Sequence, residues 1–376
     1  PRSTLFPYTT LFRSRTAGGD VLCTEHIELE RSPQTVLQHE ARLTPNAAFA
    51  AGAYVVELLD AHGQAYTLRR WYVVPRALAT VRAEFERQLR AIPTDTPEQQ
   101  QAVAICRARA ALLSDEPSEI SSAEFLLDPI DHGAAVAAEI TRLQQGQNPY
   151  RAHPGELWRV VSAGGRDLPV RMYAPRNVVE QPDRKLPLII AFHGAGGDEQ
   201  MFLYGYGAGR IRGLAEQHGV LIATPQTGDF LRSPEAFDRL LESLERDYAI
   251  DPDRIYVLGH SLGAAAAGLL ARTRADRIAA AAAIASGMGT PTAGPLAPTL
   301  VIAAELDRIT GGPDRVRQAV AAAREKGLPI EFRPLPNYGH TLVVGQVLPE
   351  LFDWLLAQRR TATSSAPASA PAPAPR

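Results

Sequence analysis

The stretch Gly259-His260-Ser261-Leu262-Gly263 decides the fold expected for the second half of this chain. It follows a strand-like run, Arg254 to Leu258, and leads into a run of small residues, Ala264 to Leu270, that favours a helix. A serine between a strand and a helix, flanked by glycines, is typical of a nucleophile elbow, in which a strained turn exposes the hydroxyl above a sheet. The helix would aim its positive end and free N–H groups at the same point. The alternative is an ordinary helix N-cap serine.

Two further segments follow the chain order that such an elbow requires. Upstream, the apolar run 186–192 predicts a buried strand that ends in His193-Gly194-Ala195-Gly196-Gly197, where glycines let backbone N–H groups approach a substrate oxygen closely. Downstream, the apolar run 299–304 predicts another strand, and Asp307 comes just after it. His340 follows a further predicted strand. The order along the chain is therefore Ser, Asp, His, as this type of elbow predicts.

These segments make residues 150–360 resemble an α/β-hydrolase. The resemblance rests on AFHGAGGDEQMF (191–202), IDPDRIYVLGHSLGA (250–264), ELDRIT (305–310) and NYGH (337–340). Within that superfamily the chain is most similar to bacterial esterases related to polyhydroxybutyrate depolymerases and feruloyl esterases, and to the catalytic domain of prolyl-oligopeptidase-type peptidases. The resemblance implies a doubly wound, mostly parallel α/β sheet.

The resemblance also implies a role for each matching residue. Ser261 would be the nucleophile, and His340 the base that takes its proton and later returns it to the leaving group. Asp307 would accept the other imidazole N–H and so fix the tautomer. The N–H groups of Ala195 and Leu262 would form the oxyanion hole.

Three other residues within or beside these motifs could be mistaken for catalytic groups and need their own interpretation. Relatives usually carry a glycine near position 304, where this chain has alanine, so Glu305 remains a second candidate for the acid. His193, at a strand end, is interpreted as a structural residue that shapes its loop. His260, inside the elbow, is interpreted as a partly buried histidine whose hydrogen bonds are satisfied.

Candidate substrate contacts come from an aromatic segment with glycines that follows the glycine run. Met201, Phe202, Tyr204 and Tyr206 are candidates for a mobile wall around an acyl or aryl group, and Met288 for the opposite side. The alternative for the aromatic segment is ordinary packing against the next helix. No long lid insertion stands between the core strands, which favours soluble or modest-sized esters, small or polymeric. A serine peptidase and a non-catalytic binding protein remain the alternative functions.

The first fourteen residues are interpreted as an artefact. Residues 4–14, TLFPYTTLFRS, back-translate to a sequence that resembles a widely used sequencing adapter, and the chain begins with proline rather than methionine. A signal peptide could have been lost at that junction. The Ala/Pro/Ser-rich tail, 361–376, is expected to be disordered and slightly favours an exported protein, secreted or periplasmic.

Composition excludes several partners. With 39 Lys and Arg against 41 Asp and Glu, the chain has no basic footprint for nucleic acid. The sequence contains no run of about eighteen apolar residues, so no membrane span is predicted. Cys23 and Cys106 match no metal-ligand spacing, and the sequence predicts neither a metal nor another cofactor. The sequence predicts neither the pairing of these cysteines nor the oligomeric state.

The residues before the hydrolase-like part form two further regions. Residues 20–75 predict a partial β-sandwich, and residues 76–148 predict a helical connector that packs against the hydrolase-like domain. The expected strands are Val21–Glu30, Thr35–Leu43, Ala53–Leu59 and Tyr66–Val74, and the expected helices are Arg76–Ala91, Glu98–Leu113 and Asp131–Gln145.

Overall fold

The structure is a computed structural model, and its contacts divide the chain into two compact units. The first unit is Pro1–Pro117 with Glu124–Pro149, and the second is Ser118–Ala123 with Tyr150–Arg376. The residues that the structure describes are 8–16, 18–29, 49–59, 63–113, 128–150, 153–233, 235–286, 295–309 and 312–360. The predicted strand Thr35–Leu43 and the tail 361–376 lie outside them.

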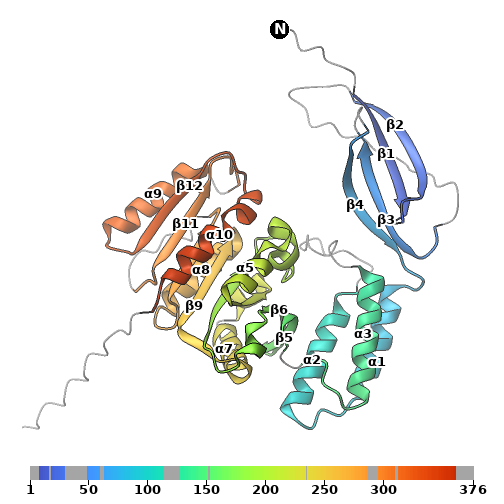
Figure 1. The fold of residues 1–376 in the computed structure, drawn as a ribbon, viewed down its shortest axis with the longest axis horizontal. Coiled ribbons are helices and arrows are strands. Elements are labelled where there is room, and N and C mark those ends of the chain that lie inside the picture. The colour runs from blue at the N-terminus through green and yellow to red at the C-terminus, as the bar shows by residue number, and fades with distance from the viewer. Residues whose placement is uncertain are drawn as a thin grey trace, which may run out of the picture. The chain divides into compact units, whose positions relative to one another are not determined.

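The first unit contains a four-stranded antiparallel sheet in the order β2-β1-β3-β4 (Figure 1). Three of its strands occur where the sequence predicts them, because short β-branched and aromatic runs there are separated by turns. The described residues of this unit form one sheet, so they do not include the second sheet that a sandwich requires. The strands are β1 Tyr8–Thr16, β2 Val21–Leu29, β3 Gly52–Leu59 and β4 Ala65–Val73.

Strand β1 was not expected, since it overlaps the segment interpreted as an artefact. It lies between β2 and β3 and pairs with both. The buried carboxylate of Glu57 on β3 accepts hydrogen bonds from Arg15 at 2.7 Å and from Arg13 at 2.7 and 3.2 Å. These two guanidinium groups lower the pKa of Glu57 to about 2. The primer origin of residues 1–14 stays a prediction, and residues 8–14 form most of strand β1 in the structure.

Deleting residues 1–14 should therefore destabilise the first unit. The deletion removes most of the strand that joins β2 to β3, so we expect the free energy of unfolding to fall by more than about 1 kcal/mol in urea titrations followed by circular dichroism. Glu57→Gln should destabilise the unit less than the deletion, because it keeps the strand and removes only the charge. Since the folded pKa of Glu57 lies below its ordinary value of 4.5, the wild-type advantage over this variant should be present above pH 4.5 and decline toward pH 2. An unchanged urea midpoint after the deletion would contradict the pairing of β1.

Three helices complete the first unit and occur close to their predicted positions. Helix α2 begins with a capping box, in which the Thr96 hydroxyl accepts the N–H of Gln99 and the Gln99 side chain accepts the N–H of Thr96. Asp128 caps α3 in a similar way, through the N–H groups of Ile130 and Asp131. Packing of these helices against the second unit stays a prediction. Their bounds are α1 Leu78–Arg90, α2 Pro97–Ala111 and α3 Pro129–Gln144.

The second unit is built on an eight-stranded sheet in the order β12-β11-β10-β9-β7-β8-β6-β5. Strand β6 is antiparallel to both of its neighbours, and all other pairs are parallel. The prediction of a mostly parallel α/β sheet is therefore confirmed. The strands are β5 Gly155–Ala163, β6 Arg166–Ala174, β7 Leu186–Phe192, β8 Leu221–Pro225, β9 Ile250–His260, β10 Ala280–Ile284, β11 Thr299–Ala304 and β12 Ile330–Leu335.

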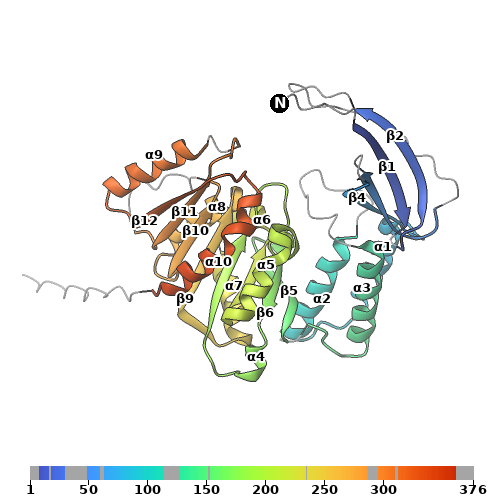
Figure 2. The ribbon, with the colours of Figure 1, turned by 45° about the horizontal axis from the view of Figure 1, so that its top comes forward.

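Helices cover both faces of this sheet (Figure 2). Successive side chains of β7 alternate between two apolar clusters: Leu188 and Ile190 pack on the side of α7 and α8, and Ile189 and Ala191 on the side of α5 and α10. This double burial explains the continuous apolar runs of the central strands. The helices are α4 Asn177–Glu180, α5 Arg210–His218, α6 Thr227–Arg232, α7 Ala236–Asp247, α8 Leu262–Thr273, α9 Gly312–Glu325 and α10 Leu342–Ala357, with the short turns η2 Met201–Gly205 and η3 Tyr206–Gly209.

Three observations concern the described residues alone. No helix among them is long and apolar enough to cross a bilayer. They contain no group of three or more His, Cys, Asp or Glu side chains placed to hold a metal ion. Cys23 and Cys106 are both buried and do not form a disulfide with each other.

Candidate active site

Ser261 occupies a strained turn between β9 and α8. Its backbone has φ 53° and ψ −113°, in a region that side chains other than glycine rarely adopt. The Ser261 N–H donates to the carbonyl of Ile284, at the end of β10, at 3.0 Å. The turn is therefore held by the neighbouring strand as well as by its own segment, and it has the strand–turn–helix form that the sequence predicts.

The two glycines of the elbow are required by close backbone contacts. A Cβ at Gly259 would lie 1.9 Å from the carbonyl oxygen of Gly263, and a Cβ at Gly263 would lie 1.9 Å from the carbonyl oxygen of Phe192. Both contacts are with backbone atoms, which cannot rotate away as a side chain can. The elbow is thus pressed directly against the end of β7, which leads into the glycine loop, residues 193–197.

Gly263→Ala should consequently cost more than about 3 kcal/mol of unfolding free energy in the second unit, because either the elbow or β7 must move. Gly213→Ala is the matched control: nothing lies within 4 Å of a Cβ built there, on the exposed side of α5. It should leave stability unchanged or raise it by about 0.4–1 kcal/mol. Urea unfolding of both variants tests this, and a Gly263→Ala protein as stable as the wild type would show that the elbow is not so tightly packed.

Asp307 and His340 meet at the carboxyl ends of the last strands. Asp307 lies three residues after β11 and is buried, and its Oδ2 is 2.9 Å from His340 Nδ1. The other carboxylate oxygen accepts the N–H of Ile309 at 2.8 Å, which fixes the side chain. Since a carboxylate only accepts, Nδ1 carries the proton and Nε2 of His340 can act as an acceptor. His340 lies between β12 and α10.

Glu305, the second candidate for the acid, has a different partner. Its exposed carboxylate accepts the N–H of Asn337 at 3.0 Å. Strand β11 ends at Ala304, so Glu305 begins the turn. Of the two carboxylates, the structure thus gives Asp307 the contact with the histidine.

The glycine loop follows β7 and approaches the elbow. A Cβ at Gly194 would lie 3.2 Å from Ser261 Cβ. The buried ring of His193 shapes the loop: Nδ1 donates to the Gly194 carbonyl at 2.7 Å, and Nε2 accepts the N–H of Thr227 at 3.1 Å. Burial lowers the pKa of His193, so the ring is a neutral structural element, in agreement with its interpretation from sequence. Leu262 is the first residue of α8, and its N–H therefore has no acceptor within the helix.

The placement of these residues in the sheet decides the fold type. With β5 to β12 counted as strands one to eight, the sheet order is 1-2-4-3-5-6-7-8, and only the second strand is antiparallel. The elbow follows strand five, the acid strand seven, and the histidine strand eight. This is the α/β-hydrolase fold.

Comparisons with known proteins give matches among solved structures. The chain resembles an S-formylglutathione hydrolase from Staphylococcus aureus at 12% identity and TM-score 0.46, over 55% of this chain and 98% of that one. It resembles a ferulic acid esterase at 14% identity and TM-score 0.45, over 55% and 98%, and Thermogutta terrifontis esterase 2 at 16% identity and TM-score 0.44, over 55% and 95%. No family model and no curated protein matches the chain.

The aromatic segment after the glycine loop mostly faces inward in this α/β-hydrolase unit. Phe202 is buried and packs edge-on against the buried ring of Tyr206, at 4.8 Å between centroids. Tyr204 contacts Arg171, at 3.0 Å, and the carboxylate of Glu156. Burial of Phe202 and Tyr206 and the hydrogen bonds of the half-buried Tyr204 are what the alternative of internal packing expects, and a substrate contact by these three residues stays a prediction.

The other two predicted substrate contacts have different outcomes. Met201 is only partly buried and lies over the glycine loop, where its Cγ would be 2.7 Å from a Cβ at Gly197. It remains a candidate for a substrate contact. Met288 lies outside the described residues.

Four exposed apolar side chains lie close in sequence to Ser261, Asp307 and His340, and they were not predicted as site residues from the sequence. They follow Ser261, flank Asp307 and follow His340, so each is within two positions of one of them. Their exposed fractions are 40% for Leu262, 53% for Leu306, 73% for Ile309 and 78% for Leu342. We refer to these four as the apolar rim. Exposed leucine and isoleucine are individually common, but these four lie next to the three site residues in the sequence, so they are candidates for contacts with a ligand.

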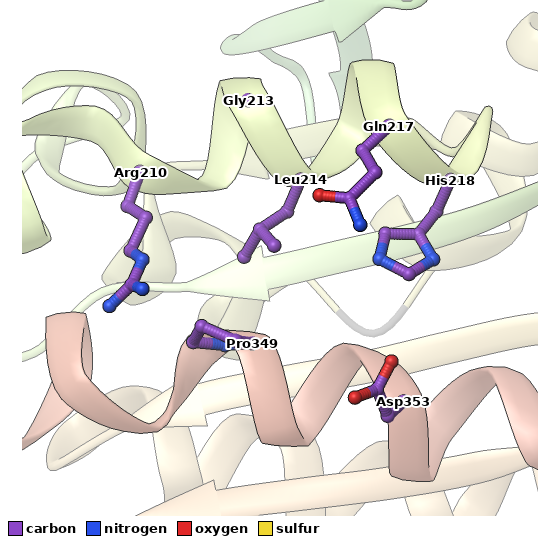
Figure 3. Close-up of a pocket in the computed structure, with 7 residues that line it drawn as sticks. All are labelled: Arg210, Gly213, Leu214, Gln217, His218, Pro349 and Asp353. Carbon is purple, nitrogen blue, oxygen red and sulfur yellow. The ribbon is translucent and has the colours of Figure 1, made fainter.

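Two hollows lie elsewhere in the α/β-hydrolase unit. Figure 3 shows the first, a groove between α5 and α10, with Asp353 across from Gln217 and His218. The second is an apolar hollow between α6, α7 and α8. Neither lining includes Ser261, Asp307 or His340. The first is lined by Arg210, Gly213, Leu214, Gln217, His218, Pro349 and Asp353, and the second by Phe192, Phe230, Leu231, Ser233, Phe237, Ala266, Leu269, Leu270, Thr273 and Arg274.

Proposed function

We propose that the α/β-hydrolase unit is a serine hydrolase that cleaves carboxylic esters through an acyl-enzyme formed on Ser261. The observation that carries the proposal is the 2.9 Å contact between the buried Asp307 carboxylate and His340, at the edge of the sheet where the elbow exposes Ser261. A buried carboxylate, a histidine and a serine in a strained turn are the groups that acyl transfer needs. A serine that only caps a helix would require neither the carboxylate, nor the histidine, nor the strained turn.

The first half of the proposed reaction forms the acyl-enzyme. Nε2 of His340 takes the proton of the Ser261 hydroxyl as Oγ attacks the ester carbonyl carbon. The resulting imidazolium donates its Nδ1–H to Asp307, which stabilises the positive charge without itself taking the proton. The N–H groups of Leu262 and Ala195 stabilise the oxyanion, each contributing on the order of 3 kcal/mol to transition-state binding. The tetrahedral intermediate then collapses as His340 protonates the leaving alcohol.

The second half returns the serine. A water molecule gives its proton to His340 Nε2 and attacks the acyl carbon, and a second tetrahedral intermediate forms. Its collapse breaks the bond to Ser261 Oγ, which receives the proton back from His340. The products are a carboxylic acid and the free enzyme. No step of this mechanism calls for a metal or another cofactor.

The substrate class follows from the surroundings of the three groups. The apolar rim supplies exposed hydrocarbon next to Ser261, Asp307 and His340 in the sequence, and the exposed Glu305 and Arg308 lie beside two of its members. This supports esters with an apolar acyl or alkyl group, either small or as the repeating unit of a polymer.

A panel of p-nitrophenyl esters beside aminoacyl-p-nitroanilides tests the proposal. We expect turnover of the esters, increasing from acetate to butyrate or hexanoate because a longer acyl chain can contact the rim. Turnover of the anilides alone would assign the chain to the peptidases. Absence of turnover in both series, with tight binding of an ester analogue, would favour the third alternative, a binding protein on this fold.

A further inference from the structure

A buried chain of hydrogen bonds connects the three segments that carry the proposed catalytic groups. The N–H of Gly194 donates to the hydroxyl oxygen of Tyr206 at 3.2 Å. That hydroxyl is 2.7 Å from Nδ1 of His260, and Nε2 of His260 is 2.9 Å from the carbonyl oxygen of His340. Tyr206 and His260 are 4% and 3% exposed, so water competes little for these groups.

The partners at the two ends determine where the protons lie. The His340 carbonyl can only accept, so Nε2 of His260 must carry its proton. Nδ1 of the neutral ring is then an acceptor, and the Tyr206 hydroxyl donates to it. The Tyr206 oxygen in turn accepts the Gly194 N–H. Every donor in the chain meets an acceptor, and one tautomer of His260 fits.

A neutral His260 is also compatible with the charges around it. Its ring lies 4.8 Å from that of His340, between centroids. Burial, followed by the proximity of the His340 ring, lowers the pKa of His260 to about 4, against the smaller opposing influences of the hydrogen bond to the His340 carbonyl and of Asp307. A neutral His260 is compatible with the imidazolium that His340 must form, whereas a second positive charge at this distance would oppose it.

We propose that Tyr206 and His260 are positioning residues, which set the place of the His340 backbone and of the glycine loop relative to Ser261. The inference rests on the proposed function. Three of the four residues in this chain of hydrogen bonds are a proposed catalytic residue or its neighbour: Gly194 precedes Ala195, His260 precedes Ser261, and the last acceptor belongs to His340 itself.

Packing around this chain of hydrogen bonds supports a positioning role for Tyr206 and His260. A Cβ at Gly194 would lie 2.8 Å from Nδ1 of His260, so the loop rests directly on the imidazole. The edge contact with Phe202 holds the Tyr206 ring, which itself meets the His260 ring edge-on at 5.1 Å. The three segments therefore share one rigid, hydrogen-bonded support rather than separate ones.

Removing the Tyr206 hydroxyl is the first test. Tyr206→Phe leaves Nδ1 of His260 and the Gly194 N–H without partners, and we expect kcat on a p-nitrophenyl ester to fall by about 10- to 100-fold with KM changed less than about threefold. The matched control is Tyr256→Phe. Tyr256 is another buried tyrosine of this unit, and its hydroxyl donates to the Gln358 carbonyl at 2.8 Å, outside the site. That variant should keep wild-type kcat.

Substitutions of His260 separate positioning from packing. His260→Leu fills the space without polar atoms and should lower kcat as Tyr206→Phe does. His260→Gln carries one acceptor and one donor group, so it can bond both Tyr206 and the His340 carbonyl and should recover most of the loss. Equal kcat for the leucine and glutamine variants, or values for Tyr206→Phe and His260→Leu within about threefold of wild type, would overturn the inference.

A spectroscopic measurement keeps this test independent of the proposed function. Nitrogen-15 NMR of the wild-type protein should show His260 as the neutral Nε2–H tautomer from pH 6 to 8. An Nδ1–H tautomer, or protonation in this range, would overturn the hydrogen-bond chain. The rate of Ser261 labelling by an alkyl fluorophosphonate should follow the same order of variants as kcat. A wild-type protein that neither hydrolyses esters nor reacts with this probe would refute the proposed function and, with it, the positioning role, while the NMR result would still decide whether the chain of hydrogen bonds exists.

Discussion

Ser261→Ala is expected to abolish ester turnover while leaving the fold intact. The hydroxyl is the only covalent nucleophile of the proposed mechanism, and a methyl group fits the space that it leaves. Loss of the nucleophile in a triad typically lowers kcat by more than about 10⁴-fold, because the remaining groups cannot act without it. Stopped assays with a p-nitrophenyl ester, beside circular dichroism and urea unfolding, measure both parts of the expectation.

A second serine in the same unit provides the control. Ser243 lies buried on α7, and its hydroxyl has no hydrogen-bond partner among the described residues. Ser243→Ala should therefore leave kcat unchanged. Retention by Ser261→Ala of more than about a hundredth of wild-type kcat would contradict the assignment of the nucleophile.

Asp307→Asn is expected to lower kcat by about 10⁴-fold with little loss of stability. The asparagine oxygen can still accept the N–H of Ile309, so the turn keeps its anchor. The amide NH₂ would then face Nδ1 of His340, where the carboxylate oxygen now lies at 2.9 Å. A donor at that place favours the tautomer with the proton on Nε2, and this nitrogen can no longer take the serine proton.

Glu305→Gln is the matched variant two residues earlier. Its amide oxygen can still accept the N–H of Asn337, so we expect kcat to stay within about twofold of wild type. The opposite pattern, with Asp307→Asn silent and Glu305→Gln strongly impaired, would transfer the acid role to Glu305.

The local motifs could be predicted from sequence because each is complete within a few residues. An apolar strand, a glycine-flanked serine and a small-residue helix predict the elbow, and the structure has that turn at Ser261. The choice between Asp307 and Glu305 stayed open, since it depends on the residue at which β11 ends. That end is at Ala304, and strand boundaries are set by pairing with distant strands rather than by local sequence.

Other features depend on tertiary contacts that the sequence does not encode locally. Three aromatic residues after the glycine loop predicted a substrate wall, but Phe202 and Tyr206 turn inward and Tyr204 bonds Arg171 and Glu156. The short turns η2 and η3 break helical periodicity there, with positive φ at Gly207, Ala208 and Gly209, so no regular spacing shows which side is buried. The role proposed for His260 likewise depends on Tyr206 and His340, which are distant in sequence.

The hydrogen bond from Ser261 N–H to Ile284 has a consequence for how the chain acquires reactivity. The elbow is stabilised only after β10 has docked beside β9, with Ile284 opposite His260. His340 belongs to a segment some eighty residues further along the chain than Ser261, so the proposed reactive centre is complete only when these distant segments have met. A nascent or partly folded chain would therefore be inert toward esters and toward serine-directed probes. The extent of covalent labelling of Ser261 would therefore report the fraction of fully folded molecules, and its rate would report the reactivity of the serine.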